Sequence, residues 1–304
     1  MPTTVTSGSN YSGKAAGAII GASFKEADTI SRGLISTLEN VNYKENLRRI
    51  RYTDGTVAYA CGFTPTGAVV LDERVITPVK LKNDLQVCKE TFRNQWGDGM
   101  LGASASNPSF LGGEISQAIL AEVLASTAVR TDDLIWNGVA ANTDEWGGFA
   151  PLFVADSAVV KPTAAGAITS ANVLAAFALV SSSIPVALRR KSLTWVISAD
   201  VADAYAQLLI ANGAANGLGG NANTGMVYGR YNLQVVNALA DNTIIVYEKE
   251  NLVFATGLLG DHNEIAVVDE DELGLLTGMV RMKMVYNGGV NYYNSEDIVY
   301  YVGA

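Results

Sequence analysis

The chain ends in five short runs rich in apolar and aromatic residues: NLVFATGLLGD (251–261), EIAVV (264–268), MVRMKMVY (279–286), VNYYN (290–294) and DIVYYV (297–302). Runs of this composition, separated by Gly, Asp and Asn, are typical of β-strands. The pair Gly288–Gly289 between the third and fourth runs predicts a turn. The segment Asn251–Ala304 is therefore predicted to be a ladder of strands, and it contains no recognisable catalytic pattern.

The composition of the whole chain favours a protein that faces other protein. Its 304 residues are enough for about two domains. Only 17% of residues are charged, whereas 49% are hydrophobic and 30 are glycine. Soluble domains average about 25% charged residues. Such a surface favours a subunit of a larger assembly, and the alternative is a compact monomer with a small polar surface.

The charge of the chain argues against a dedicated nucleic-acid-binding protein. The formal net charge is -9, and such binders need a basic face that displaces counterions from phosphate. Two local basic clusters remain, Arg48–Arg51 and Arg189–Lys191. Each is interpreted as a solvated patch or as a set of ion-pair partners at a subunit contact.

The sequence offers no sign of secretion or of a membrane span. Two cysteines, Cys61 and Cys88, are too few to define a disulfide framework. The start Met1–Val5 lacks the charged and apolar regions of a signal peptide. No run approaches the roughly 18 apolar residues of a spanning helix. We therefore expect a protein that matures in a reducing cytoplasm and does not contact a membrane.

The first half of the chain predicts an arm, a helix and a hairpin. Residues 1–30 are rich in Ser, Gly, Ala and Thr, which predicts an extended arm ordered by a neighbour. Apolar residues at helical spacing predict a helix over 28–51. Apolar and polar residues then alternate between Gly and Pro turns, which predicts a long β-hairpin over 52–88. A hairpin alone is marginal in water, so its apolar side needs a cover.

The middle of the chain predicts a long helix followed by an α/β region. The helix runs from Glu114 to Gly138, with a wide apolar stripe and glycine at its end. Further elements are expected in this order: a helix at 169–180, a buried strand at 193–197, a helix at 198–210, a flexible loop at 212–225, and strands at 233–236 and 243–247.

Two glycine-rich stretches resemble nucleotide-binding motifs, but neither meets the requirements of its motif. Gly8–Ala15 has Ala15 where a phosphate-binding loop needs Ser or Thr for Mg²⁺, and no apolar strand precedes it. Gly217–Ala222 follows a helix instead of a strand, and no helix clearly opens after it. We interpret the first as part of the flexible arm and the second as a surface loop.

The remaining candidate residues for catalysis or metal binding are also weak. His262 is the only histidine and stands among polar loop residues, which is typical of an exposed side chain. One histidine with Cys61 and Cys88 does not make a zinc site. The acidic run Asp269–Glu272 lacks the spaced ligands and central Gly of a calcium loop, so we expect a solvated turn. The sequence thus predicts no catalytic residue, no cofactor site, no metal site and no enzyme.

The order of these elements resembles the subunit of tailed-phage major capsid proteins, the Hong Kong 97 fold. The resemblance covers roughly residues 25–304 and is carried by the end of the long helix, DLIWNG (133–138), by NLVFATG (251–257) with Asp261, and by 279–302. It implies an α+β fold with an N-terminal arm (1–30), a peripheral domain with a long spine helix (31–51, 89–140 and 265–304, the closing strand belonging to it or to the axial domain), an extended E-loop hairpin (52–88) and an axial domain (141–264).

The resemblance also implies a function and partners. Subunits of this family form pentamers and hexamers that close into an icosahedral shell around double-stranded DNA. The hairpin would lie across a neighbouring subunit, and the loop 212–225 would lie near the capsomer axis. Scaffolding, portal and decoration proteins are the expected further partners, with DNA contacted weakly by a wall of net negative charge. Because only about 30 residues precede the match, a separate scaffolding protein or none is expected. The location would be the virion, after assembly in the host cytoplasm.

Two alternatives remain open from the sequence. An encapsulin, a cellular nanocompartment subunit, shares the same fold and would enclose an enzyme. A small-molecule enzyme with an unrecognised site is the third hypothesis. Shells, tubes or rings of five or six subunits would favour the first two, whereas a monomer with a deep polar pocket would favour the third.

Overall fold

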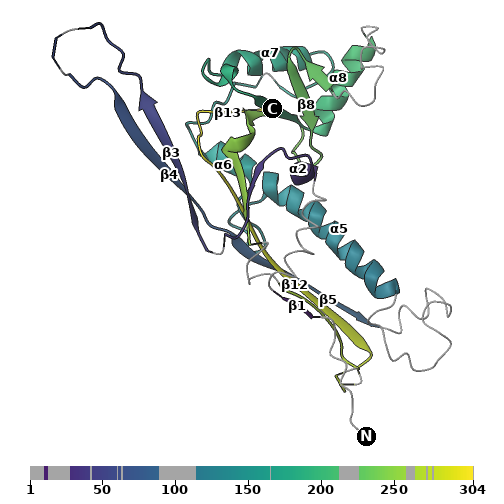
Figure 1. The fold of residues 1–304 in the computed structure, drawn as a ribbon. Coiled ribbons are helices and arrows are strands. Elements are labelled where there is room, and N and C mark those ends of the chain that lie inside the picture. The colour runs from purple at the N-terminus through teal and green to yellow at the C-terminus, as the bar shows by residue number, and fades with distance from the viewer. Residues whose placement is uncertain are drawn as a thin grey trace.

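The computed structural model describes most of the chain, namely residues 10–12, 28–41, 43–59, 61–62, 64–88, 114–164, 166–211, 226–257, 264–271, 273–275 and 277–303. The segments 13–27 and 212–225 and the residue His262 lie outside the described residues. The described residues form two sheets, a projecting hairpin and several helices (Figure 1).

A six-stranded sheet runs through the lower half of the molecule (Figure 1). Its central strand is β12 (Met279–Tyr292), which pairs on one side with β5 (Val79–Cys88). On its other side it pairs with β11 (Glu264–Asp269) and then with β10 (Leu252–Thr256). Two three-residue strands extend these neighbours: β1 (Asn10–Ser12) pairs with β11, and β2 (Ser36–Leu38) pairs with β10.

The long helix α5 (Glu114–Asn137) covers one face of this sheet and spans about 36 Å at 1.5 Å per residue. Its last turns bury Leu134, Ile135 and Trp136 against the sheet and against α6 (Phe149–Ala155). The one-turn helix α2 (Asp28–Ser31) packs on α5, where the backbone N–H of Thr29 donates to Asp132 Oδ1 at 3.0 Å. The predicted spine helix is therefore present with the predicted bounds.

A five-stranded sheet forms the upper part of the molecule. Its strand order is β13-β9-β6-β8-β7, in which β6 and β8 are parallel and the other pairs are antiparallel. The strands are β6 (Leu193–Ile197), β7 (Met226–Tyr228), β8 (Tyr231–Val235), β9 (Thr243–Glu248) and β13 (Ile298–Val302). The helices of this part are α7 (Val173–Ser183), α8 (Ala199–Ala211) and the 3-10 turns Leu188–Arg190 and Lys249–Asn251.

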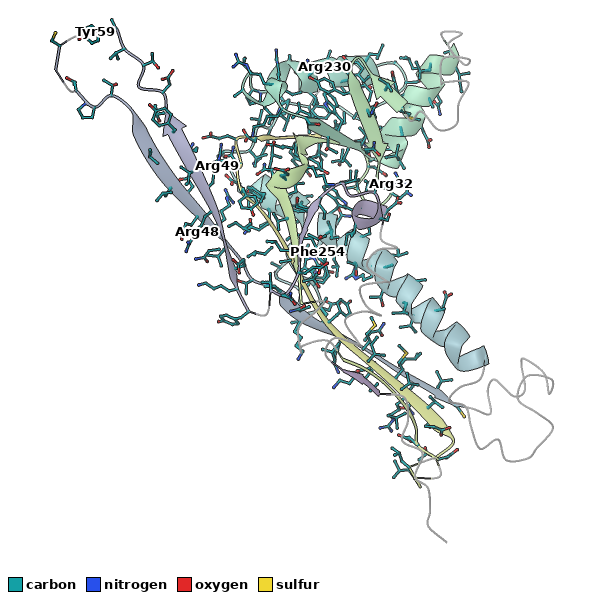
Figure 2. All side chains as sticks on the ribbon, in the orientation of Figure 1. Arg32, Arg48, Arg49, Tyr59, Arg230 and Phe254 are labelled. Carbon is teal, nitrogen blue, oxygen red and sulfur yellow. The ribbon has the colours of Figure 1, made fainter. Side chains whose placement is uncertain are left out.

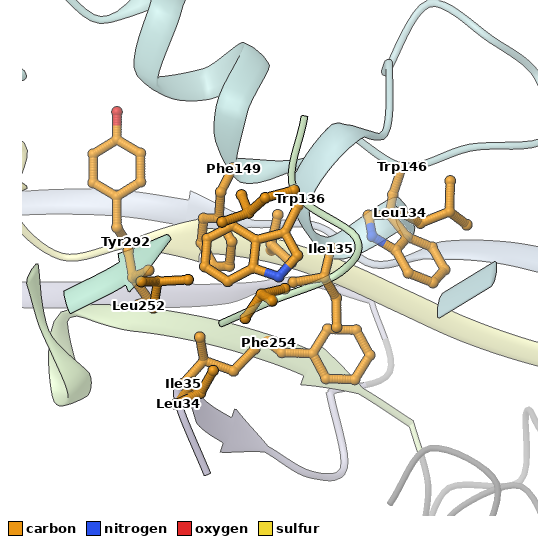
Figure 3. Packing of buried hydrophobic residues seen from close by; sticks show 14 of the residues in the cluster. Leu34, Ile35, Leu134, Ile135, Trp136, Trp146, Phe149, Leu252, Phe254 and Tyr292 are labelled. Carbon is orange, nitrogen blue, oxygen red and sulfur yellow. The ribbon is translucent and has the colours of Figure 1, made fainter. Parts of the chain in front are cut away.

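Aromatic side chains fill the core where α5 and α6 meet the lower sheet (Figure 3). Trp136 and Phe149 lie with ring centroids 5.5 Å apart, and Phe153 lies 5.4 Å from Tyr292. A second core under α7 and α8 is built around Phe177 and Trp195. A third, small cluster joins the hairpin base to β10 and consists of Val41, Leu47, Ile76, Val253 and Ala255.

The predicted hairpin exists, but its strands differ from the prediction. It consists of β3 (Glu45–Thr53) and β4 (Ala68–Ile76), paired antiparallel, with the connection 54–67 at its tip. Residues 56–59, expected to lie in a strand, belong to this connection. The third run of the predicted hairpin is β5, which leaves the hairpin after Thr77–Pro78 and pairs with β12.

The helix predicted over 28–51 is wrong beyond its first turn, because α2 ends at Ser31 and the strands β2 and β3 follow. The alternation that defines β3 is visible in Leu47–Tyr52, where every second side chain turns to the same face of the hairpin.

The turn predicted at Gly288–Gly289 is also wrong, because β12 continues through both glycines. A Cβ at Gly288 would lie 2.8 Å from the ring of Trp146, and a Cβ at Gly289 would lie 3.1 Å from Pro78 Cα. Glycine here permits a close approach of neighbours to the strand. The closing segment is thus divided: β10, β11 and β12 belong to the lower sheet, and β13 belongs to the upper sheet.

Candidate assembly interface

The hairpin β3–β4 projects away from both sheets, and its tip points into solvent (Figures 1 and 2). Its two faces follow from the register, because directly opposed residues of an antiparallel pair share a face. One face carries the opposed pairs Leu47–Arg74, Arg49–Asp72 and Arg51–Val70, and the other carries Arg48–Glu73, Ile50–Leu71 and Tyr52–Val69.

The first face is turned toward the body and is held there by charged groups. Arg74 donates to Asp156 Oδ2 at 2.5 Å, and its guanidinium lies 4.2 Å from the centroid of the Tyr292 ring. Further out, Arg51 donates to Glu296 at 3.2 Å and Arg49 lies 3.8 Å from Asp297. These contacts hold the hairpin against the end of α6, the end of β12 and the loop that precedes β13.

Asp156 is the central anion of this anchor. Burial acts to raise its pKa, but the Ala158 N–H, Arg74 and the Tyr292 hydroxyl all donate to its carboxylate and hold the pKa below the usual value. Burial and the bond to Asp156 raise the pKa of Tyr292 to about 12. Both groups therefore keep one protonation state at neutral pH, and the anchor is a permanent one.

The second face is apolar along its outer half, and its large side chains there are mostly exposed. The exposed fractions are 70% for Ile50 and Leu71, 67% for Tyr52 and 65% for Val69. Nine of the nineteen large exposed hydrophobic residues described lie between Tyr43 and Val75, although this stretch is a small part of the chain. Exposed apolar patches of this kind mark surfaces that contact other molecules.

The tip loop is held by its own hydrogen bonds. Asp54 accepts from the backbone N–H of Thr56 at 2.9 Å and from its hydroxyl at 2.5 Å, and the Thr66 hydroxyl donates to the carbonyl of Gly55. The hydrogen bonds to Thr56 keep the pKa of Asp54 below its ordinary value. Tyr59 is 92% exposed at this end (Figure 2). The hydrogen bonds order both ends of the loop, and Tyr59 between them is an exposed aromatic side chain.

A groove of about 490 Å³ separates the hairpin base from the body, and its walls carry charges of both signs. Lys191 contacts Glu248 at 2.5 Å and Asp297 at 3.3 Å, and Asp297 also faces Arg49. The acids and bases neutralise one another within this chain. These internal ion pairs hold two parts of the chain together. The groove is therefore better suited to positioning the hairpin than to binding a charged ligand.

The two basic clusters noted in the sequence make ion pairs and caps inside the chain. Arg48 pairs with Glu73 at 3.1 Å and Arg51 with Asp72 at 2.8 Å, both across the hairpin. Arg189 donates to the carbonyls of Ser181, Ser182 and Ile184 at the end of α7. The clusters were interpreted as solvated patches or as ion-pair partners at a subunit contact, and the structure gives most of their charges partners within this chain.

The acidic run at the β11–β12 connection differs from the solvated turn that was expected. Asp269 and Glu270 are buried, Glu270 contacts Arg281 at 2.7 Å, and its carboxylate accepts from the Thr277 hydroxyl. Asp271 accepts from the backbone N–H of Gly278 at 2.8 Å. These carboxylates stabilise the turn, because they bind other groups of the same chain.

The weak enzyme motifs gain nothing from the structure. Of Gly8–Ala15, only Asn10–Ser12 is described, as the strand β1, while Gly217–Ala222 and His262 lie outside the described residues. Cys61 is exposed on the hairpin tip and Cys88 ends β5, and both are free thiols. Among the residues that the structure describes, no group of three His, Cys, Asp or Glu could hold a metal ion. None of the described helices has the length and hydropathy needed to cross a bilayer.

Sequence reasoning missed the outer face of the hairpin. In LRRIRY (47–52) the residues of this face alternate with arginines. The two adjacent arginines at the start of this stretch obscured the two-residue periodicity of a strand. The signal that could have revealed it is the second apolar run, AVVL (68–71), which needs an antiparallel partner of the same length.

Comparison with known proteins finds likeness in structure alone. No protein-family model and no curated protein sequence matches the chain. The capsid of the native GTA particle matches with a TM-score of 0.64 and 13% identity, over 92% of this chain and 90% of that one. The capsid of Myoviridae phage XM1 matches with a TM-score of 0.57 and 12% identity, over 91% and 92%. A virus-like particle from Pyrococcus furiosus matches with a TM-score of 0.53 and 12% identity, over 95% and 98%.

Proposed function

Because the chain has the Hong Kong 97-like capsid fold, we propose that it is the major capsid protein of a tailed bacteriophage. In this role it assembles into pentamers and hexamers of an icosahedral shell that encloses double-stranded DNA. The observation that carries the proposal is the hairpin β3–β4, whose outer face is apolar, exposed and turned away from its own body. A subunit surface of this kind needs a second subunit to cover it.

The shell is held together by the surface that neighbouring subunits bury against one another. Obligate interfaces commonly exceed about 2,000 Å². A two-stranded ribbon is marginal in water by itself, so contact with a neighbour supplies the missing cover for its apolar side. The ion pairs at its base direct the ribbon outward before assembly, and this reduces the entropy lost on docking.

The parts of the subunit take the roles that the fold implies. The peripheral domain (31–51, 89–140 and 265–304) is built on α5 and on β12 of the lower sheet, whose strands β5 and β10 lie outside these ranges, and β13 returns to the upper sheet. The region 141–264 forms the axial domain around each capsomer axis, with the loop 212–225 near that axis. The arm 1–30 reaches a further neighbour. Scaffolding, portal and decoration proteins are the remaining partners of the shell.

The charge of the subunit suits a container for DNA. A net charge of -9 leaves the wall without the counterion-releasing surface that would bind phosphate strongly. The packaged DNA is therefore contacted weakly and without sequence preference. The finished protein resides in the virion capsid after assembly in the host cytoplasm, and its role requires no catalysis and no cofactor.

Electron microscopy with sedimentation velocity tests this function on the protein expressed alone and with its scaffolding partner. Closed shells, tubes, or rings of five or six subunits are expected. A 32 kDa species that stays monomeric in concentrated salt and with the scaffold would contradict the proposal.

A nanocompartment shell is the second candidate, because the likeness to the virus-like particle covers 95% of this chain. The capsid of phage XM1 matches with the higher TM-score, 0.57 against 0.53, which supports the phage capsid. The contents of particles purified from the native source separate the two: double-stranded DNA supports the capsid, and an enclosed enzyme supports the nanocompartment.

A further inference from the structure

A pocket whose only charged residues are arginines lies in the upper part of the molecule, where Figure 2 labels Arg230. Its volume is about 700 Å³, and it lies between the end of α7 and the tight turn that joins β7 to β8. No Asp, Glu or His is among its described lining residues, whereas the groove at the hairpin base holds Glu248, Glu250 and Asp297. The polar residues of the lining are Ser181, Ser182, Arg189, Tyr228, Arg230 and Tyr231.

Arg230 is held in this pocket by a tight turn and an aromatic stack. Gly229 has a φ of +60° as the first residue of the two-residue connection between β7 and β8, a conformation that favours glycine. The Arg230 guanidinium lies 4.9 Å from the centroid of the Tyr231 ring, and that ring stacks on the buried Trp195 at 5.1 Å. Nη2 of Arg230 donates to the Tyr231 hydroxyl at 2.8 Å and to the carbonyl of Arg189 at 3.3 Å. The cation is therefore positioned before a ligand binds.

Arg189 lines the same pocket and compensates the one feature there that would repel an anion. The last carbonyls of a helix carry partial negative charge, and α7 ends beside the pocket. Nε and Nη2 of this arginine donate to the carbonyls of Ser181, Ser182 and Ile184 at 3.0 to 3.3 Å. The positive charge of Arg189 thus neutralises the helix end, and its Nη1 group is left for other acceptors.

The two guanidinium groups keep N–H donors free for a ligand. Within the described residues, Nε and Nη1 of Arg230 and Nη1 of Arg189 make no hydrogen bond, and neither arginine pairs with a carboxylate. By contrast, Arg48 and Arg51 of the hairpin each pair with a carboxylate of the same chain. In a protein of net charge -9, this pocket is therefore a local excess of positive charge that an anion can neutralise.

We propose that the pocket formed by Arg189 and Arg230 binds a phosphate group of charge close to -2, the charge of a phosphate monoester at neutral pH. Two guanidinium groups match this charge, and their N–H groups can bind different oxygens of one phosphate. A carboxylate or a phosphate diester carries a single charge and would leave one arginine uncompensated. The phosphates of a DNA backbone are diesters, so the site goes beyond the proposed shell function and does not depend on it.

The first test measures the binding of methyl phosphate, a monoester, to the purified protein by phosphorus NMR titration at low ionic strength. Arg230→Gln removes one arginine of the pocket. Arg190→Gln is the matched control, because Arg190 is exposed, carries the same charge and does not line the pocket. We expect Arg230→Gln to raise the dissociation constant at least about tenfold, and Arg190→Gln to change it by less than about twofold. Circular dichroism and thermal melting check that both variants are folded.

The second test compares methyl phosphate with dimethyl phosphate at two pH values. A monoester gains its second charge with a pKa of about 6, whereas a diester has no second proton to lose. The described lining holds no carboxyl or imidazole group, and its ionisable residues are Arg189, Tyr228, Arg230 and Tyr231. We therefore expect the wild type to bind methyl phosphate at least about fivefold more tightly at pH 7.5 than at pH 5. Dimethyl phosphate should bind more weakly at pH 7.5 than methyl phosphate and gain nothing from the rise in pH.

Four outcomes would overturn the inference. No measurable binding of methyl phosphate by the wild type shows that the pocket is not a phosphate site. Equal loss of affinity in Arg230→Gln and Arg190→Gln shows only diffuse attraction to surface charge. Equal affinity for the two esters at pH 7.5, or no gain for methyl phosphate above pH 5, shows that the site does not select a dianion. Particle formation by the wild type tests the shell function separately, so the failure of either proposal leaves the other intact.

Discussion

At the scale of single residues, Asp132 joins the one-turn helix α2 to the long helix α5. Its buried carboxylate accepts the backbone N–H of Thr29, and the Thr29 hydroxyl accepts from Trp136 Nε1 at 2.7 Å. Asp132→Ala leaves the Thr29 N–H without its acceptor, so we expect a loss of about 1–3 kcal/mol in the free energy of unfolding. Asp132→Asn keeps an acceptor oxygen and is expected to lose less. Urea unfolding of both variants measures the difference, and equal losses would contradict this explanation.

The same carboxylate predicts a pH dependence. Burial raises the pKa of Asp132 above its ordinary value, and the hydrogen bonds from Thr29 only partly oppose this. The folded protein therefore binds the proton more tightly than the unfolded chain does. Relative to Asp132→Asn, the wild type should gain stability as the pH falls through the raised pKa. Thermal unfolding between neutral and mildly acid pH tests the sign, and parallel curves for the two proteins would rule it out.

The Arg74–Asp156 contact predicts the behaviour of the hairpin base. Because the pKa of Asp156 is lowered in the folded protein, its stabilising contribution is present above the ordinary carboxyl pKa and is lost as the pH falls through the lowered value. Arg74→Ala should lower, already at neutral pH, the hydrogen-exchange protection of β3 and β4 that the wild type is expected to lose only in acid. Arg48→Ala is the matched control, since Arg48 pairs with Glu73 within the hairpin. Equal exchange rates in both variants would show that Arg74 is no anchor.

At the scale of elements, the two glycines in β12 leave room for neighbouring groups, and Trp146 packs directly against the strand at Gly288. Gly288→Ala would place a Cβ 2.8 Å from the Trp146 ring and 3.3 Å from the ring of Phe254. Such overpacking typically costs about 1–3 kcal/mol. Gly147→Ala is the control, because the new Cβ would meet only the Cβ of Ala140, at 3.3 Å. Chemical denaturation should place Gly288→Ala well below Gly147→Ala, and the reverse order would contradict the packing argument.

Elements stabilised by local patterns could be predicted, and pairings between distant segments could not. The helix α5 and the strand β6 were predicted with their observed bounds, because a periodic stripe or a short apolar run defines each. The hairpin was predicted with the wrong strands, because β5 has the alternation of a hairpin strand but pairs with β12, about two hundred residues later. Nothing local in β5 distinguishes these partners. The helix predicted through 31–51 failed because the apolar spacing there fits both periods, and the tertiary contact of Leu47 with Ile76 and Val253 selects the strand.

At the scale of the whole molecule, the candidate interface could be predicted only in outline. The shortage of charged residues indicated contact with other protein, and the resemblance placed that contact on a hairpin. Which face of the hairpin is exposed depends on the body that covers the other face, namely Asp156, Glu296 and Asp297, which follow the hairpin by 80 to more than 200 residues. The β11–β12 turn likewise depends on buried carboxylates, although the sequence predicted a solvated turn there.

Shortening the hairpin separates folding from assembly in the whole molecule. Arg49 and Asp72 are directly opposed, so residues 50–71 can be replaced by Asn-Gly, a two-residue loop that suits antiparallel strands. Leu47 and Ile76 stay buried at the base, and the only ion pairs lost with Arg51 are exposed ones worth about 0–1 kcal/mol each. We therefore expect a monomer in sedimentation velocity whose melting temperature lies within a few degrees of the wild type.

The apolar outer rows are absent from this variant, so it should form no particles under conditions in which the wild type does. A shortened protein that assembles normally would show that the hairpin is dispensable and that other surfaces hold the shell together.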